Sequence, residues 1–245
     1  MKNSMNPYLR KSLYLVAIIG MVVLFVFLKR NQNKQICEEI VVEIEAPIEK
    51  QIITSSRVKD KLDEWYDGGL SGVPPEKLSL SDIEKRLENI PAVKNAEVSF
   101  DLRGTLHIAI EQRLPVVRII NSNGESYYLS LDNFKIPVAG TDVARVPICN
   151  DRLSTSMIKK VYTLSTYVYE NEFMEALTEQ IFVNNNSDLV IIPKIKNQRV
   201  IIGDTLDLEA KFKKLKDFYV HGLNHIGWDK YRTINLKFKD QIVCN

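Results

Sequence analysis

The sequence has few of the residues and none of the local motifs that mark an enzyme active site or a metal centre. Its 245 residues include 3 cysteines and 3 histidines. C-x-x-C pairs, H-E-x-x-H, G-x-S-x-G and G-x-x-x-x-G-K are all absent. The 31 acidic residues place some carboxylates close together in any fold, so they decide nothing by themselves. We therefore predict a protein that is not an enzyme, with no cofactor, no metal and no small-molecule substrate.

The low glycine and proline content and the small net charge of residues 31–245 also indicate the class of protein. The chain has 10 glycines and 9 prolines against 45% hydrophobic and 26% charged residues, which is typical of folded domains. Residues 1–30 hold five basic and no acidic groups, so the remaining residues carry 28 basic and 31 acidic groups, a net charge of −3. A nearly neutral body gives no electrostatic reason to expect nucleic-acid binding.

The histidines and cysteines could form a metal site or a disulfide. His221 and His225 have helical i, i+4 spacing, but no glutamate lies between them and the nearby glycines suggest that the helix ends there, so we do not predict a metal site. Cys37, Cys149 and Cys244 are an odd number and widely spaced. One disulfide is possible in an oxidising compartment, and the sequence does not choose the pair. We expect Cys149 to be buried, and Cys37 and Cys244 to be more exposed.

The longest uncharged stretch runs from Leu13 to Leu28. As a helix it would measure about 24 Å, short of the roughly 30 Å hydrocarbon core, but flanking lysines and arginines can extend the usable length by snorkelling. A cleaved signal peptide is the alternative, although no small-x-small cleavage site follows. We predict a single transmembrane helix over residues 13–28, with residues 1–12 cytoplasmic and the body outside the cytoplasm.

The next part of the chain predicts a small α+β domain over residues 37–113. A strand-like run at 36–45 is followed by two amphipathic helices, the first capped by a serine and the second opened by a Ser81-x-x-Glu84 capping box. Two alternating runs around Arg103-Gly104-Thr105 predict a hairpin. The order is therefore β-α-α-β-β, with two helices on one face of a small sheet.

A proline interrupts the stretch I-E-Q-R-L-P-V-V-R-I between two strand-like runs. Because proline cannot donate to a sheet ladder, we place a domain seam at Leu114-Pro115. Residues 114–245 then predict a mixed-sheet β domain with packed helices, ending in a strand that includes Ile234, Leu236 and Phe238 and runs almost to the last residue.

The helix end, the hairpin and the seam share a pattern of residues, namely Ile90, Pro91, Val93, Ala96, Val98, Leu106, Ile108, Glu111, Arg113, Pro115 and Val116. This pattern resembles that of the bacterial cell-division protein family FtsQ, called DivIB in other bacteria. The resemblance implies a short cytoplasmic tail, one membrane span, a POTRA domain and a β domain. POTRA domains also occur in outer-membrane barrel assembly proteins, but no long barrel sequence follows here.

The resemblance also implies a function and a binding site. The chain would be a single-pass inner-membrane scaffold at the division septum, with its body in the periplasm. It would bind FtsB-type and FtsL-type division proteins and other divisome proteins, and would help to regulate septal peptidoglycan synthesis. The partner-binding positions would be Tyr231, Asn235, Leu236, Lys237 and Phe238. By strand alternation, Ile234 and Leu236 could equally serve the core, and Phe238 could lie in either place.

Two alternatives remain open at this point. The first is a periplasmic POTRA-type chaperone or secretion and assembly adaptor, which would accept many peptides at the same strand edge. The second is a membrane-anchored hydrolase, which would lose its activity when His221 or a carboxylate is replaced.

Overall fold

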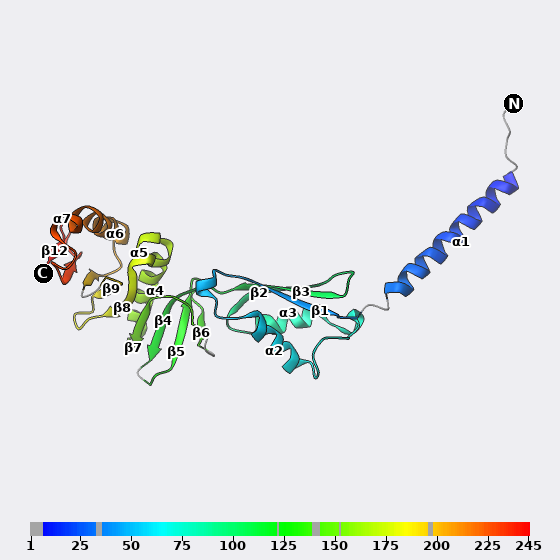
Figure 1. Cartoon of the computed structure of the whole chain (residues 1–245), viewed down its shortest axis with the longest axis horizontal. Helices are drawn as coiled ribbons and strands as arrows, with labels where there is room; N and C mark the ends of the chain where they lie inside the picture. Colours follow the sequence, from blue (N-terminus) through cyan, green and yellow to red (C-terminus); the bar gives the residue numbers. More distant parts are fainter. Residues whose placement is uncertain (1–6, 33–35, 122, 139–142, 152, 196–197) are drawn as a thin grey trace, which may run out of the picture. The chain divides into compact units, whose positions relative to one another are not determined.

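The computed structural model describes residues 7–32, 36–121, 123–138, 143–151, 153–195 and 198–245 (Figure 1). The chain forms two compact units. The first comprises residues 1–44, 54–89 and 95–110, and the second comprises residues 45–53, 90–94 and 111–245. The units are therefore not simply consecutive, because the second unit includes two short segments that precede residue 111.

Helix α1 covers Pro7–Gln32 at the N-terminal end. Its described side chains, residues 14–26, are exposed. Within the part of the chain that the structure describes, no helix has the length and apolarity needed to cross a membrane. Leu13, Phe27 and Leu28, which belong to the predicted span, lie outside the described side chains.

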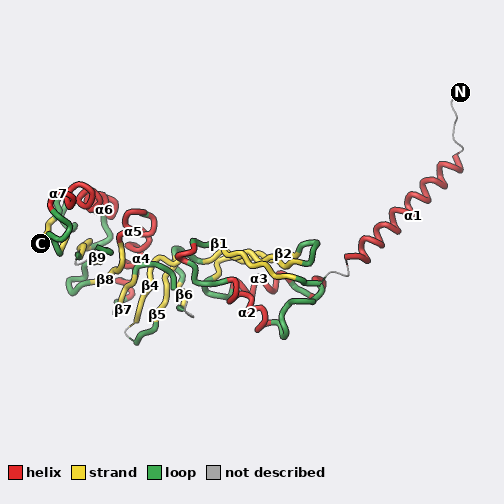
Figure 2. Tube along the Cα trace, in the orientation of Figure 1, coloured by secondary structure: helices red, strands yellow, loops and turns green. Residues whose placement is uncertain are grey.

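The first unit has the predicted element order. Its elements are β1 (Glu39–Glu45), α2 (Ser55–Trp65), η2 (Pro75–Lys77), α3 (Leu80–Glu88), β2 (Val93–Phe100) and β3 (Thr105–Gln112). The sheet order is β1-β3-β2, and both helices lie on one side of the strands (Figure 2). Its buried residues include Val58 and Leu62 of α2, Ile83 and Leu87 of α3, and Ala96, Val98, Leu106, Ile108 and Ile110 of the hairpin.

Both predicted helix caps in this unit were wrong. Thr54 caps α2, its Oγ1 accepting from the Arg57 N–H at 3.4 Å. Helix α3 begins at Leu80, so Ser81 lies inside its first turn, and Glu84 bonds elsewhere. The Glu84 carboxylate accepts a hydrogen bond from the Val98 N–H at 2.9 Å, because β2 lies beside the helix and its amide competes for the carboxylate. Sequence spacing cannot reveal such a tertiary partner.

The β2–β3 hairpin turns at Asp101–Gly104. The Asp101 carboxylate accepts from the N–H groups of Arg103 and Thr105, at 2.8 and 2.9 Å. Gly104 has φ +94°, and a Cβ at this position would lie 2.7 Å from the Ile36 carbonyl oxygen. The two amide bonds, that from Thr105 being the stronger influence, lower the pKa of Asp101 to about 2.

This turn predicts an acid-dependent loss of stability. The folded pKa of Asp101 lies below its ordinary value, so its contribution is complete above about pH 4 and is lost as the pH falls toward 2. Thermal unfolding measured in small pH steps should show a smaller drop in Tm between pH 4 and pH 2 for Asp101→Asn than for the wild type. Equal pH slopes for the two proteins would contradict the assignment.

The second unit contains one mixed sheet of nine described strands. In chain order these are β4 (Pro115–Asn121), β5 (Ser126–Ser130), β6 (Lys135–Pro137), β7 (Ile148–Asp151), β8 (Thr178–Val183), β9 (Leu189–Pro193), β10 (Arg199–Gly203), β11 (Thr233–Asn235) and β12 (Val243–Cys244). Their order across the sheet is β12-β11-β10-β9-β8-β7-β4-β5-β6. The pairs β4–β7, β7–β8 and β10–β11 are parallel, and the other described pairs of strands are antiparallel.

Helices pack against this sheet and form its core. They are α4 (Thr155–Glu170), α5 (Glu172–Leu177), α6 (Leu208–Asp217), the π-helix η3 (Phe218–Leu223) and the short α7 (Asn224–Ile226). The core joins Val161, Leu164 and Val168 of α4 and Phe212 and Leu215 of α6 to inward residues of the strands. Pro115 opens β4 beside an irregularity in its pairing with β5, a position where the missing N–H is tolerated.

The segment 45–53, which includes η1 (Ile48–Lys50), is fixed to the second unit by Gln112. The Gln112 side chain is 2% exposed. Its Oε1 accepts from the N–H groups of Ile52 and Ile53 at 2.7 and 3.2 Å, and its Nε2 donates to the Lys50 carbonyl at 2.9 Å. A second Nε2 bond reaches the Arg113 carbonyl at 3.4 Å, so the amide uses all of its hydrogen-bonding capacity.

Candidate partner-binding edge

The C-terminal end of the large sheet is formed by two short strands. Strand β11 pairs in parallel with β10, with Arg199 opposite Thr233 and Ile201 opposite Asn235. Strand β12 pairs antiparallel with the other side of β11. The prediction of one strand that runs almost to the last residue was therefore wrong, because the chain turns after β11 and returns as β12 along its outer side.

The backbone of Cys244 faces the outer side of the sheet. Thr233 and Asn245 exchange two hydrogen bonds, at 2.9 and 3.0 Å. Hydrogen-bonded and non-hydrogen-bonded pairs alternate in an antiparallel ladder, so the next pair, Ile234 and Cys244, is non-hydrogen-bonded. The N–H and C=O of Cys244 consequently point away from β11, and no described strand follows β12 in the sheet. These groups can template a strand from another chain.

The predicted site residues fall into buried and accessible groups. Ile234 and Leu236 are buried against the core, at 0% and 1% exposure. Leu236 also donates its N–H to the Ile201 carbonyl at 2.9 Å, so both its side chain and its N–H are used within the second unit. Asn235 is half-buried in β11, and its Oδ1 accepts from the Lys237 N–H at 3.0 Å, which turns the chain out of the strand.

Lys237 already has an acidic partner within the unit. Its ammonium lies 2.9 Å from the Asp188 carboxylate, and its stem packs against Gly203. Gly203 has φ +82°, and a Cβ there would lie 2.8 Å from the Lys237 Cγ. Its lack of a side chain therefore leaves room for the lysine stem, and an acid from a partner would compete with Asp188.

Phe238 and Tyr231 are accessible aromatic residues beside this edge. Phe238 is 50% exposed, so the structure excludes it from the core. Its carbonyl accepts from the Lys214 ammonium at 2.7 Å, which holds the turn between β11 and β12 against α6. Tyr231 is half-buried, and its ring centroid lies 6.3 Å from that of Phe218.

Sequence reasoning missed β12 itself. Val243 is 46% exposed and Cys244 is half-buried. A two-residue strand has no measurable periodicity, and the only signal was the apolar run Ile242-Val243-Cys244 after a charged turn. Burial raises the pKa of the Cys244 thiol. Burial is also the main reason that the pKa of the Tyr219 hydroxyl is raised, and the nearby Cys244 raises it further.

The other candidate groups are dispersed. His221 is exposed in η3 and His225 is exposed in α7. Among the described residues, no group of three or more His, Cys, Asp and Glu side chains is arranged to hold a metal ion. The three cysteines are free thiols, and Cys37 is fully buried, contrary to the exposure expected for it. Its N–H donates to the Val73 carbonyl and its carbonyl accepts from the Gly72 N–H, so the loop that contains Gly72 and Val73 lies against it.

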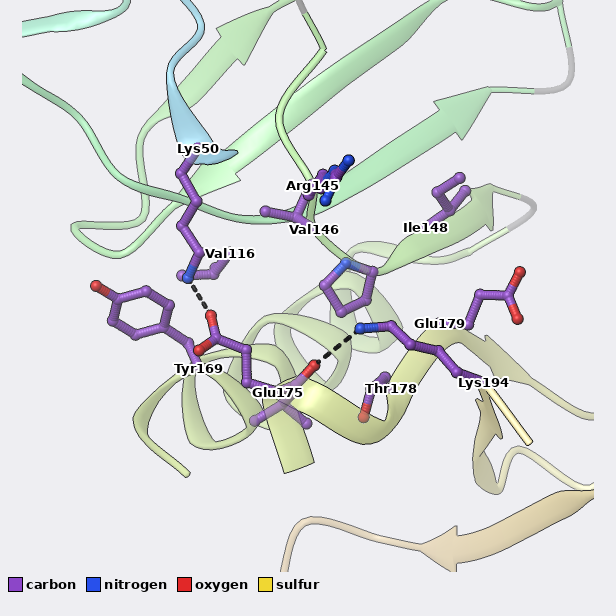
Figure 3. Close-up of a pocket in the computed structure, with 12 residues that line it drawn as sticks. Lys50, Val116, Arg145, Val146, Ile148, Tyr169, Glu175, Thr178, Glu179 and Lys194 are labelled. Carbon is purple, nitrogen blue, oxygen red and sulfur yellow. Dashed lines mark hydrogen bonds and ion pairs between the residues drawn. The ribbon is translucent and has the colours of Figure 1, made fainter. Parts of the chain in front are cut away.

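A hollow of about 500 Å³ lies elsewhere in the second unit (Figure 3). Its apolar wall includes Val116, Val146 and Ile148. Lys50 forms an ion pair with Glu175, and its ammonium also lies 3.8 Å from the centre of the Tyr169 ring. The Lys194 ammonium is 3.5 Å from the Glu175 carbonyl. The Lys50 contacts join residues 45–53 to α4 and α5. The described lining contains no histidine, cysteine or serine.

Comparison with known proteins adds two matches. A family model described as FtsQ/DivIB, C-terminal related, matches residues 114–245, which is more than half of the chain. A POTRA-like domain model matches residues 35–111. The curated proteins contain no match to this sequence.

Proposed function

Because the chain belongs to the FtsQ/DivIB family of cell-division proteins, we propose that it is a non-enzymatic scaffold of the divisome. It binds FtsB-type and FtsL-type division proteins through the C-terminal edge of its large sheet, and it contacts other divisome proteins. Through these contacts it helps to regulate septal peptidoglycan synthesis without making or breaking a bond itself.

One observation carries this proposal. Strand β12 ends the sheet with the N–H and C=O of Cys244 directed outward, and the half-exposed Phe238 follows β11 in the chain, in the turn that leads to β12. A partner strand that adds to a sheet edge gains affinity from main-chain bonds and specificity from side-chain pockets. An edge residue and an accessible aromatic together supply both features.

The proposed location rests on sequence. The uncharged stretch Leu13–Leu28 and the family resemblance support an anchor in the bacterial inner membrane, with the N-terminus in the cytoplasm and the body in the periplasm at the septum. Main-chain recognition at β12 does not depend on this placement.

Phe238→Ala tests the side-chain part of the site. An exposed aromatic that enters a partner pocket typically contributes enough for its truncation to weaken binding about tenfold or more. The affinity of the full chain for the extracytoplasmic segments of the FtsB–FtsL-type pair should fall by that factor, with an unchanged Tm. Lys239→Ala, which changes a neighbouring exposed residue, should bind as the wild type does. Equal affinities for all three proteins would remove Phe238 from the site.

A further inference from the structure

A second hollow opens where strands β10 and β11 begin. Its volume is about 580 Å³, and its lining is formed by Ile192, Gln198, Arg199, Arg232 and Thr233. Ile192 contributes from β9, so the hollow crosses three neighbouring strands of the sheet. It lies at the opposite end of β11 from Asn235 and the turn that contains Phe238.

Two guanidinium groups are concentrated at this hollow. Arg199 is opposite Thr233 in the parallel ladder, and its N–H donates to the Arg232 carbonyl at 2.8 Å. Both arginines are exposed. Among the residues that the structure describes, neither guanidinium lies within ion-pair distance of a carboxylate, whereas Lys211 and Lys237 of the same unit each have an aspartate partner. The hollow therefore presents two exposed guanidinium groups to an acidic partner.

The wall of the hollow is rigidly built around Gln198. This side chain is 2% exposed, its Oε1 accepts from the Tyr219 hydroxyl at 2.7 Å, and its Nε2 donates to the Trp228 carbonyl at 2.8 Å. The Trp228 ring lies 5.8 Å from the Tyr219 ring and is 42% exposed. Gln198 thus joins the lining of the hollow to the Tyr219 hydroxyl and to the main chain of Trp228.

We propose that this hollow is a second interaction site, which binds an extended segment of a partner protein that carries acidic side chains. A guanidinium presents a planar set of donors that pairs with a carboxylate through two parallel hydrogen bonds. Arginine is also one of the residues most enriched at binding hot spots. The proposed site uses the side chains of Arg199 and Arg232 and not the outward main chain of Cys244, and the proposal stands whether or not the chain acts in division.

The test uses the full chain in a non-ionic detergent and two fluorescent eight-residue peptides. One peptide alternates valine with glutamate, and the other alternates valine with glutamine. Fluorescence anisotropy should show binding of the glutamate peptide that weakens with added salt, and at least tenfold weaker binding of the glutamine peptide. The double variant Arg199→Glu/Arg232→Glu should bind the glutamate peptide at least tenfold more weakly than the wild type.

Three controls keep the result specific. Lys59→Glu/Lys159→Glu changes the net charge equally at two other exposed positions and should bind as the wild type does. Arg199→Gln/Arg232→Gln should also lose binding and serves if the charge-reversed protein does not fold. Cys244→Pro, which alters the β12 edge, should leave peptide binding unchanged.

Several outcomes would overturn the proposal. These are equal binding of the two peptides by the wild type, unchanged binding by the arginine variants, or loss of binding in Cys244→Pro, which would place the peptide at β12. Binding to vesicles of anionic phospholipid that depends on both arginines, with no peptide binding, would instead assign the hollow to a membrane surface.

Discussion

Replacing Gln112 by leucine is expected to lower the free energy of unfolding of the second unit by about 3 to 5 kcal/mol, because each buried polar group left without a partner costs about 1 to 3 kcal/mol. Four groups lose this partner, namely the N–H groups of Ile52 and Ile53 and, with the longest bond at 3.4 Å to Arg113, the carbonyls of Lys50 and Arg113. Leucine is close to glutamine in size, so the loss comes from hydrogen bonding more than from an empty cavity.

Urea unfolding followed by tryptophan fluorescence measures this effect. The chain has two tryptophans, Trp65 in the first unit and Trp228 in the second, so a Trp65→Phe background reports on the second unit alone. Gln180→Leu is the matched control, since the side chain of Gln180 is exposed and surface changes of this kind typically fall within about 0.5 kcal/mol. If Gln112→Leu changed stability no more than this control, residues 45–53 would not be held as described.

Cys244→Pro is expected to weaken binding of the FtsB–FtsL-type pair at least tenfold, while Cys244→Ala binds nearly as well as the wild type. Proline removes the outward N–H and places its ring at the edge where a partner strand would lie. Alanine shortens the side chain but keeps the donor. A loss of one hydrogen bond worth about 1.4 kcal/mol already corresponds to a tenfold change in affinity.

The geometry of β12 separates this effect from unfolding. The pairs that bond β12 to β11 involve Val243 and Asn245, so a proline at Cys244 leaves those amides in place. The Tm of Cys244→Pro should therefore lie close to that of Cys244→Ala, and both proteins can be compared in isothermal titration calorimetry. If both variants bound equally well, the partner would not be recognised through the main chain of β12.

Long periodic segments of the sequence predicted the fold well. The alternating runs of β2 and β3 and the amphipathic pattern of α3 appear as predicted, because one face of each element is buried and the pattern records that burial. The order β-α-α-β-β also follows from such patterns. Such patterns did not predict the partner of Glu84, because the Val98 amide that it binds is distant in sequence.

The candidate site was harder to predict, because its geometry also depends on contacts between residues that are distant in sequence. The alternation of Ile234 and Leu236 correctly suggested the core, but alternation alone placed Phe238 in the same strand. The strand instead ends at Asn235, whose side chain bonds the Lys237 N–H, and the chain then turns at Asp240 with φ +59°. Strand β12 and the pairing of Lys237 with Asp188 depend on tertiary contacts that have no local signature.

Amide hydrogen exchange of the full chain, with and without the FtsB–FtsL-type pair, tests the central claim most directly. Addition of a partner strand to β12 predicts slower exchange at residues 242–245 when the pair is present. The amide of Cys244 should gain the most protection, because its N–H points to the open edge. If the pair did not bind, or if it protected other surfaces and left residues 242–245 unchanged, the account of this edge as the partner-binding site would be contradicted.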